Sequence, residues 1–89
     1  MIIDMVKVGQ IMADNQPDNC TSMIVALDID NGTLRLGYES HYGYDSIVCH
    51  SYDFMFSEFQ FMYSIIEHIE REIVRISENI NRQIEESNQ

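Results

Sequence analysis

Residues 24–36 have the sequence IVALDIDNGTLRL, in which two apolar runs flank the dipeptide Asn31-Gly32. An Asn-Gly pair favours the positive φ angles that a two-residue type I′ hairpin turn requires. With this turn, Leu27 lies opposite Leu36, and the apolar side chains of both strands share one face of the hairpin. We therefore predict an antiparallel β-hairpin whose apolar face belongs to the core.

The chain on either side of the hairpin completes a small α+β fold. Residues 46–53 form a third candidate strand, with Ile47 near Tyr38. Upstream, residues 2–13 carry apolar side chains at spacings of three and four, which is typical of a short amphipathic helix. Downstream, residues 54–86 lack Gly and Pro and repeat isoleucine at helical spacing. The predicted order is a short helix, a three-stranded antiparallel β-meander and a long helix (α-β-β-β-α).

The second half of the long helix has two possible roles. A helix over 54–86 would be on the order of 50 Å long at 1.5 Å per residue, which exceeds what a three-stranded sheet can cover. Its apolar face narrows to a seam that suits either packing against the N-terminal helix or pairing with a second chain. We therefore predict a single domain, 1–89, with about 70–86 as a helical extension or self-association segment. The seam consists of Ile66, Ile69, Ile73, Ile76 and Ile80.

The charge of the chain is strongly negative. Its 89 residues include 15 Asp and Glu against 5 Lys and Arg, for a formal net charge of −10. Such a field repels nucleic acid and anionic membranes and attracts basic proteins. Counter-ion release cannot drive direct binding to DNA or RNA. Helix-surface pairs such as Glu67–Arg71 and Glu78–Arg82 offset part of the charge near the C-terminus.

Several acids, most of which have no base nearby in the sequence, are predicted to form a partner-binding surface. If strand ends and loops gather these carboxylates on one face, they resemble a row of phosphates and fit a basic nucleic-acid-binding groove. Two tyrosines near the predicted strand connection would anchor the contact, because Tyr is enriched at interface hot spots. The alternative is that the acids only solvate the surface. The candidates are Asp28, Asp30, Glu39, Asp45, Asp53, Glu58, Tyr42 and Tyr44.

Signals for catalysis or metal binding are weak. The chain has neither a Gly-x-Ser-x-Gly elbow nor a phosphate-binding glycine loop, so we expect no enzyme activity and no cofactor. Cys49 and His50 are adjacent and would point to opposite faces of a strand. The run from Asp28 to Gly32 partly resembles a calcium loop, but its glycine falls one place early. The hairpin explains these residues with fewer assumptions, and we expect no metal site.

Two resemblances bear on function. The element order resembles that of the double-stranded RNA-binding domain, but residues 54–58 replace the basic cluster that begins the last helix of that family. The small size, the net charge of −10 and the lack of catalytic motifs are similar to those of small inhibitors that phages make against host defences, including some anti-CRISPR proteins. This second resemblance implies an inhibitor that mimics DNA and binds a basic nuclease or DNA-binding protein.

Other functions remain open from the sequence. A homo-oligomeric structural or adaptor module, assembled through the long helix, is one alternative. An immunity or antitoxin-type inhibitor, which blocks an enzyme outside any DNA groove, is another. Residues 1–4 lack a basic signal-peptide start, and no stretch approaches the ~20 apolar residues of a membrane span, so we expect a cytoplasmic protein that binds no membrane.

Overall fold

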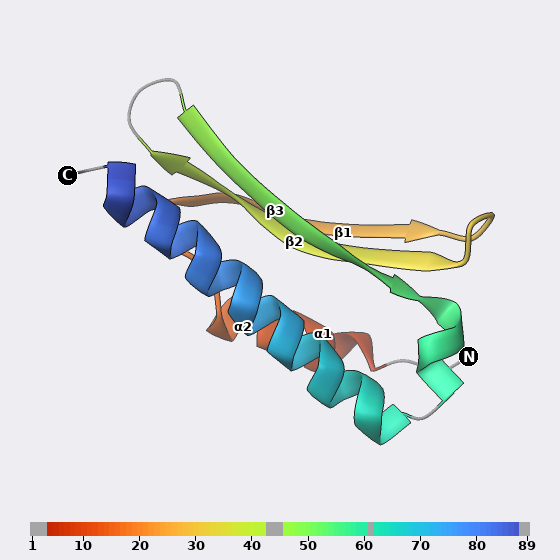
Figure 1. Ribbon diagram of the computed structural model, residues 1–89. Coiled ribbons are helices and arrows are strands. Elements are labelled where there is room, and N and C mark those ends of the chain that lie inside the picture. Colours follow the sequence, from red (N-terminus) through yellow and green to blue (C-terminus); the bar gives the residue numbers. More distant parts are fainter. Residues whose placement is uncertain (1–3, 43–45, 61, 88–89) are drawn as a thin grey trace.

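The computed structural model describes residues 4–42, 46–60 and 62–87 (Figure 1). Three strands form one antiparallel sheet in the order β1-β2-β3, and both helices lie against the same face of it. The predicted α-β-β-β-α order is therefore confirmed. The elements are α1 (Met5–Asp14), β1 (Cys20–Asp28), β2 (Thr33–Tyr42), β3 (Ser46–Met55), the 3₁₀ segment η1 (Phe56–Gln60) and α2 (Met62–Ser87).

The first helix begins at a side-chain cap. The Asp4 carboxylate accepts a hydrogen bond from the main-chain N–H of Lys7 at 3.1 Å, which satisfies one of the free donors of the first turn. At the other end, the side-chain amide of Asn15 donates to the carbonyl of Ile11 at 2.9 Å. The helix predicted over residues 2–13 is thus present, although its first two predicted positions lie outside the described residues. Its buried face consists of Val8, Ile11 and Met12.

The turn between β1 and β2 differs from the predicted one. Asp28 pairs with Thr33, so the loop contains residues 29–32 instead of two residues. The Asp28 carboxylate accepts hydrogen bonds from the main-chain N–H of Asn31 at 3.1 Å and from its side-chain amide at 2.7 Å. Gly32 has a positive φ of 64°, whereas a type I′ turn needs two such residues. The Asp28 side chain therefore closes a wider loop than the Asn-Gly pair predicts.

The strand registers differ from the predictions in two ways. In the first hairpin Leu27 lies opposite Leu34, a shift of two residues that keeps every side chain on its predicted face. In the second, His50 lies opposite Tyr38 where Ile47 was predicted, and this odd shift exchanges the two faces of β3. The exchange has a clear physical reason, because it places larger side chains of β3 in the core. Those on the helix-covered face include Val48, Tyr52 and Phe54.

The long helix also begins later than predicted. Residues 54 and 55 continue β3, and η1 then turns the chain toward α2. Two contacts hold this turn: the N–H of Phe56 donates to the Gly32 carbonyl at 2.8 Å, and the N–H of Met55 donates to the Glu58 carboxylate at 2.8 Å. The prediction that the helix begins at residue 54 is therefore wrong. Residues 54 and 55 belong to β3, and residues 56–60 form η1.

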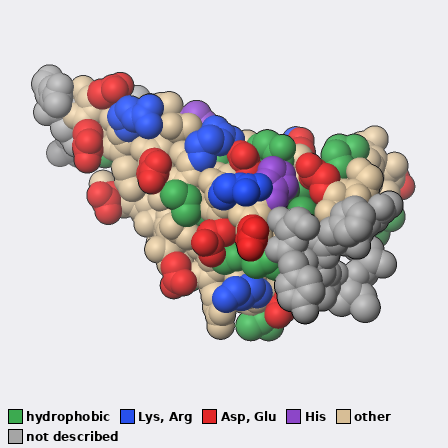
Figure 2. All heavy atoms as spheres, turned by 60° about the horizontal axis from the view of Figure 1, so that its bottom comes forward, with side chains coloured by type: hydrophobic (Ala, Val, Ile, Leu, Met, Phe, Trp, Pro, Cys, Tyr) green, Lys and Arg blue, Asp and Glu red, His purple; other side chains and the backbone are tan. Residues whose placement is uncertain are grey.

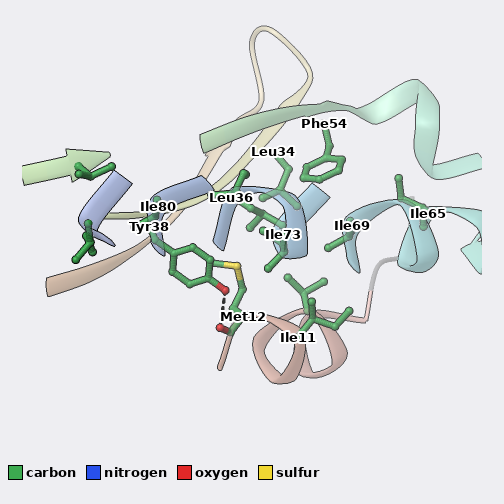
Figure 3. Packing of buried hydrophobic residues seen from close by; sticks show 14 residues of the cluster. Ile11, Met12, Leu34, Leu36, Tyr38, Phe54, Ile65, Ile69, Ile73 and Ile80 are labelled. Atoms are coloured by element: carbon green, nitrogen blue, oxygen red, sulfur yellow. Dashed lines mark hydrogen bonds between the residues drawn. The ribbon is translucent and has the colours of Figure 1, made fainter. Parts of the chain in front are cut away.

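The core lies between the sheet and the two helices (Figure 3). Leu34, Leu36 and Tyr38 of β2 point toward the isoleucines of α2, and side chains of α1 close the core from the other side. The predicted seam is part of this core, since Ile69, Ile73, Ile76 and Ile80 are fully buried and Ile66 is partly buried against them. In this conformation the seam packs inside one chain, which is the alternative that the sequence left open beside self-association.

Candidate functional site

The sheet face that points away from the helices is the candidate binding surface, and we call it the open face. Side chains alternate along a strand, so the residues between buried core positions point to this face. Arg35 lies between buried Leu34 and Leu36, and its cross-strand neighbours are Ala26 and Asp53. The charged side chains on the open face are Asp28, Arg35, Glu39 and Asp53.

An ion pair links β2 and β3 on the open face. Arg35 binds Asp53 through two hydrogen bonds, from Nε to Oδ1 at 2.7 Å and from Nη2 to Oδ2 at 3.1 Å. The Arg35 guanidinium, by hydrogen bonding and by its charge, lowers the pKa of the Asp53 carboxyl. The pKa of Asp28 is lowered mainly by its hydrogen bonds to Asn31. Both acids are therefore ionised at neutral pH.

These residues border a small hollow in the surface. Its volume is about 170 Å³. Ionised carboxylates and one guanidinium rim it, so it offers hydrogen-bond acceptors on both sides of a paired cation. The hollow is lined by Ala26, Leu27, Asp28, Thr33, Arg35 and Asp53.

Glu39 lies farther along the same face. It lies four residues beyond Arg35 on β2, a separation of about 13 Å in an extended strand. Its carboxylate accepts a hydrogen bond from the Ser22 hydroxyl at 3.2 Å, and its main-chain carbonyl accepts one from the Thr21 hydroxyl at 3.2 Å. Glu39 is thus held in place by two hydroxyl donors from β1.

The other predicted partner-binding residues do not join this group. Asp30 is exposed in the β1–β2 loop, beside the open face. Glu58 lies in η1 with its Oε1 3.5 Å from Nε2 of His68, so it faces α2. Tyr42 ends β2, but its side chain is outside the description, and Tyr44 and Asp45 lie outside the described residues altogether. The structure therefore brings together Asp28, Glu39 and Asp53, and it separates Glu58 from them.

The helical side of the molecule carries charges of both signs. Figure 2 shows Asp and Glu side chains interspersed with Lys and Arg on this side. Arg75 pairs with Glu72 at 2.7 Å, three residues earlier. The predicted pairs Glu67–Arg71 and Glu78–Arg82 are not among the ion pairs of the described residues. Because cations alternate with acids here, this side is a weaker candidate for binding a basic partner than the open face.

Sequence reasoning missed one feature of the surface. Val25 and Leu27 of β1, which were predicted to lie in the core, are 55% and 58% exposed. Met23 lies on the same face and is 48% exposed, and we call these three residues the β1 apolar row. They alternate along the strand on the same face as the core. Their alternation predicted the correct face, but the sequence holds no signal that a helix would leave this strand uncovered.

Comparisons with known proteins add no further assignment. No protein-family model matches the chain, and no curated protein and no solved structure matches it. Within the described residues, no cluster of three or more His, Cys, Asp or Glu side chains is placed to hold a metal ion. Nor does any helix of the described chain combine the length and the apolar character needed to cross a membrane.

Proposed function

We propose that this chain is a small acidic binding protein of the cytoplasm that inhibits a nuclease or other nucleic-acid-binding protein by occupying its basic groove. The observation that supports this proposal is the open face, where Asp28, Glu39 and Asp53 share one uncovered sheet surface and Arg35 is the one Lys or Arg among its described residues. That cation is already paired with Asp53. The face is therefore anionic in a chain whose net charge is −10.

The mechanism of binding is electrostatic. Arginines and lysines that normally hold phosphates would meet the carboxylates of the open face, and ion pairs between them would replace the contacts to nucleic acid. The long-range field of the chain speeds the encounter with a basic partner. Because salt screens charges over ~10 Å at 0.1 M, affinity should fall steeply as salt is added.

The partner is identified by capture on the immobilised chain in about 0.1 M salt, followed by elution with duplex DNA. We expect DNA to displace a basic protein, and the purified protein should then bind either DNA or this chain, but not both. A partner that DNA leaves bound would contradict groove occupancy and favour the immunity or antitoxin type of inhibition.

Matched variants show whether the open face makes the contact. Glu39→Gln combined with Asp53→Asn removes two charges from the open face, and Glu70→Gln combined with Glu86→Gln removes two from exposed positions of α2. The first pair should weaken binding to the captured partner by about tenfold or more and reduce its salt dependence. The second should change affinity only about twofold. Equal effects would show that total charge acts, without a specific role for the open face.

A further inference from the structure

The β1 apolar row is exposed because the fold has two helices for three strands. α2 packs against β2 and β3, and α1 packs chiefly against α2. The core-facing side of β1 is therefore left to solvent. Across the hairpin, Met23, Val25 and Leu27 lie opposite Tyr38, Leu36 and Leu34, which are all buried. An apolar sheet face is normally buried against another element, so this part of the core is incomplete in one chain.

β1 is also an edge strand that lacks the usual protection. An edge strand presents a row of free main-chain N–H and C=O groups, and proteins protect such edges with Lys, Pro or a covering element. The nine residues of Cys20–Asp28 include neither Lys, Arg nor Pro, and their one charge is Asp28 at the end. On β3, the other edge, Val48 and Phe54 are buried on the helix-covered face. Ile47 and Met55 of β3 are exposed too, but they lie on the open face, whereas the exposed apolar residues Met23, Val25 and Leu27 of β1 lie on the core-facing side.

The charges at this edge favour a second copy of the chain as its occupant. In an antiparallel pair of β1 strands about a two-fold axis near Ile24, Met23 of each copy lies beside Val25 of the other. The two Asp28 carboxylates then lie at opposite ends, about 27 Å apart for eight extended residues. That separation exceeds the ~10 Å over which charges act at 0.1 M salt. Self-pairing thus places the two β1 apolar rows side by side and gives partners to the free main-chain groups of both strands, with the two Asp28 carboxylates far apart.

We propose that β1 pairs antiparallel with β1 of a second copy, giving a two-fold symmetric dimer with a continuous six-stranded sheet. The interface is isologous, because the same strand contributes from both chains. The dimer places two open faces on one surface, and it does not depend on the proposed inhibitor function. Salt distinguishes the two: two chains of charge −10 repel, so added salt should strengthen the dimer, whereas it should weaken binding to a basic partner.

Sedimentation equilibrium of the full chain, from about 10 μM to about 1 mM and at about 0.1 and 0.5 M salt, tests the proposal. We expect a monomer–dimer equilibrium with a lower Kd at the higher salt. Val25→Glu should raise Kd about tenfold or more, because it places a charge in the paired edge. Ile47→Glu is the matched control: it adds the same charge at a position 59% exposed on the open face of β3, and Kd should change less than about threefold. A monomer at about 1 mM, or equal effects of both variants, would overturn the proposal.

A second measurement separates strand pairing from other contacts. The amide protons of β1 that point away from β2 should exchange more slowly as the protein concentration rises, whereas those of the outer edge of β3 should not change. The neutral variant Met23→Gln should also weaken the dimer, so the effect does not rest on charge alone, and circular dichroism confirms that each variant is folded. A dimer whose β1 amides stay unprotected, or one that survives in both Val25→Glu and Met23→Gln, excludes the proposed interface.

Discussion

The hydroxyl of Tyr38, in β2, donates a hydrogen bond of 2.5 Å to the main-chain carbonyl of Met12 in α1. The Tyr38 side chain is fully buried, so this bond lies inside the core (Figure 3). It joins the sheet to the helix that otherwise packs chiefly on α2. Because Met12 precedes the end of α1 by two residues, the bond fixes the C-terminal turn of that helix under the sheet.

Tyr38→Phe should therefore destabilise the fold. The substitution keeps the ring but leaves the Met12 carbonyl without its buried donor, which costs about 1–3 kcal/mol. Urea unfolding should show a lower midpoint at an unchanged slope. Tyr52→Phe is the control, since that half-buried hydroxyl has no hydrogen bond to another described residue, and it should cost only a few tenths of a kcal/mol. Equal losses in the two variants would contradict the role of the bond.

The same tyrosine should make the protein sensitive to alkali. Burial raises the pKa of Tyr38. The unfolded chain then loses this proton first, near about pH 10, so the stabilisation is complete below that pH and is lost progressively above it. The free energy of unfolding should fall from about pH 10 upward, and Tyr38→Phe should show a shallower fall. An identical alkaline profile in the two proteins would show that Tyr38 ionises as readily folded as unfolded.

Gly37 is required by the close approach of β2 and β3. A Cβ at this position would overlap the carbonyl oxygen of His50 and lie 2.6 Å from Cα of Ser51, and main-chain atoms of a sheet cannot yield to it. Gly37→Ala should cost on the order of 3 kcal/mol or more, measured by thermal or urea unfolding. Gly9→Ala is the control, because its Cβ meets no atom within 4 Å and it lies in a helix. Gly9→Ala should raise the free energy of unfolding by up to about 1 kcal/mol. The same Gly→Ala substitution is therefore expected to destabilise the protein at position 37 and to stabilise it at position 9.

Ile73 tests the position of the isoleucine seam. It is fully buried within the chain, so Ile73→Ala should lower the free energy of unfolding by about 2–5 kcal/mol at any protein concentration. Val74→Ala, at the adjacent and less buried position, should cost clearly less. A loss that appears only at concentrations where the protein associates would instead place the seam between chains.

The order of the elements could be predicted because each one has its own periodic signal. The isoleucines of α2 recur at helical spacing, and the apolar residues of β1 and β2 alternate around Asn31-Gly32. The register could not be predicted in the same way. At the first turn, the Asp28 side chain competes with the Asn-Gly preference and widens the loop. These hydrogen bonds depend on the position of Asp28 relative to Asn31 in space. The turn preference of the Asn-Gly dipeptide does not take that position into account.

The faces of β3 show a different limit. Ile47 and Cys49 on one side compete with Val48 and Phe54 on the other, and both sets are apolar enough for a core. The number of apolar residues does not show which face of β3 enters the core. The larger area that the aromatic side chains bury favours the observed face. The candidate site depends on this choice, since Asp53 reaches the open face only in the observed register. The exposure of the β1 apolar row depends on how α1 docks, a contact between distant parts of the chain.

The pairing of Arg35 with Asp53 predicts how the stability depends on acid. Arg35 lowers the pKa of Asp53 in the folded protein. The stabilisation is therefore present above the unfolded pKa of about 3.9 and is lost as the pH falls through the lower folded value. Asp53→Asn should be less stable than the parent at neutral pH, by a small amount because both side chains are about half exposed to screening water. The difference should shrink as the pH falls below about 4, where the parent also loses the charge. Urea unfolding of both proteins between neutral pH and about pH 2 measures this difference in stability. A difference that stays constant down to about pH 2 would show that the substituted amide acts through packing and not through the lost charge.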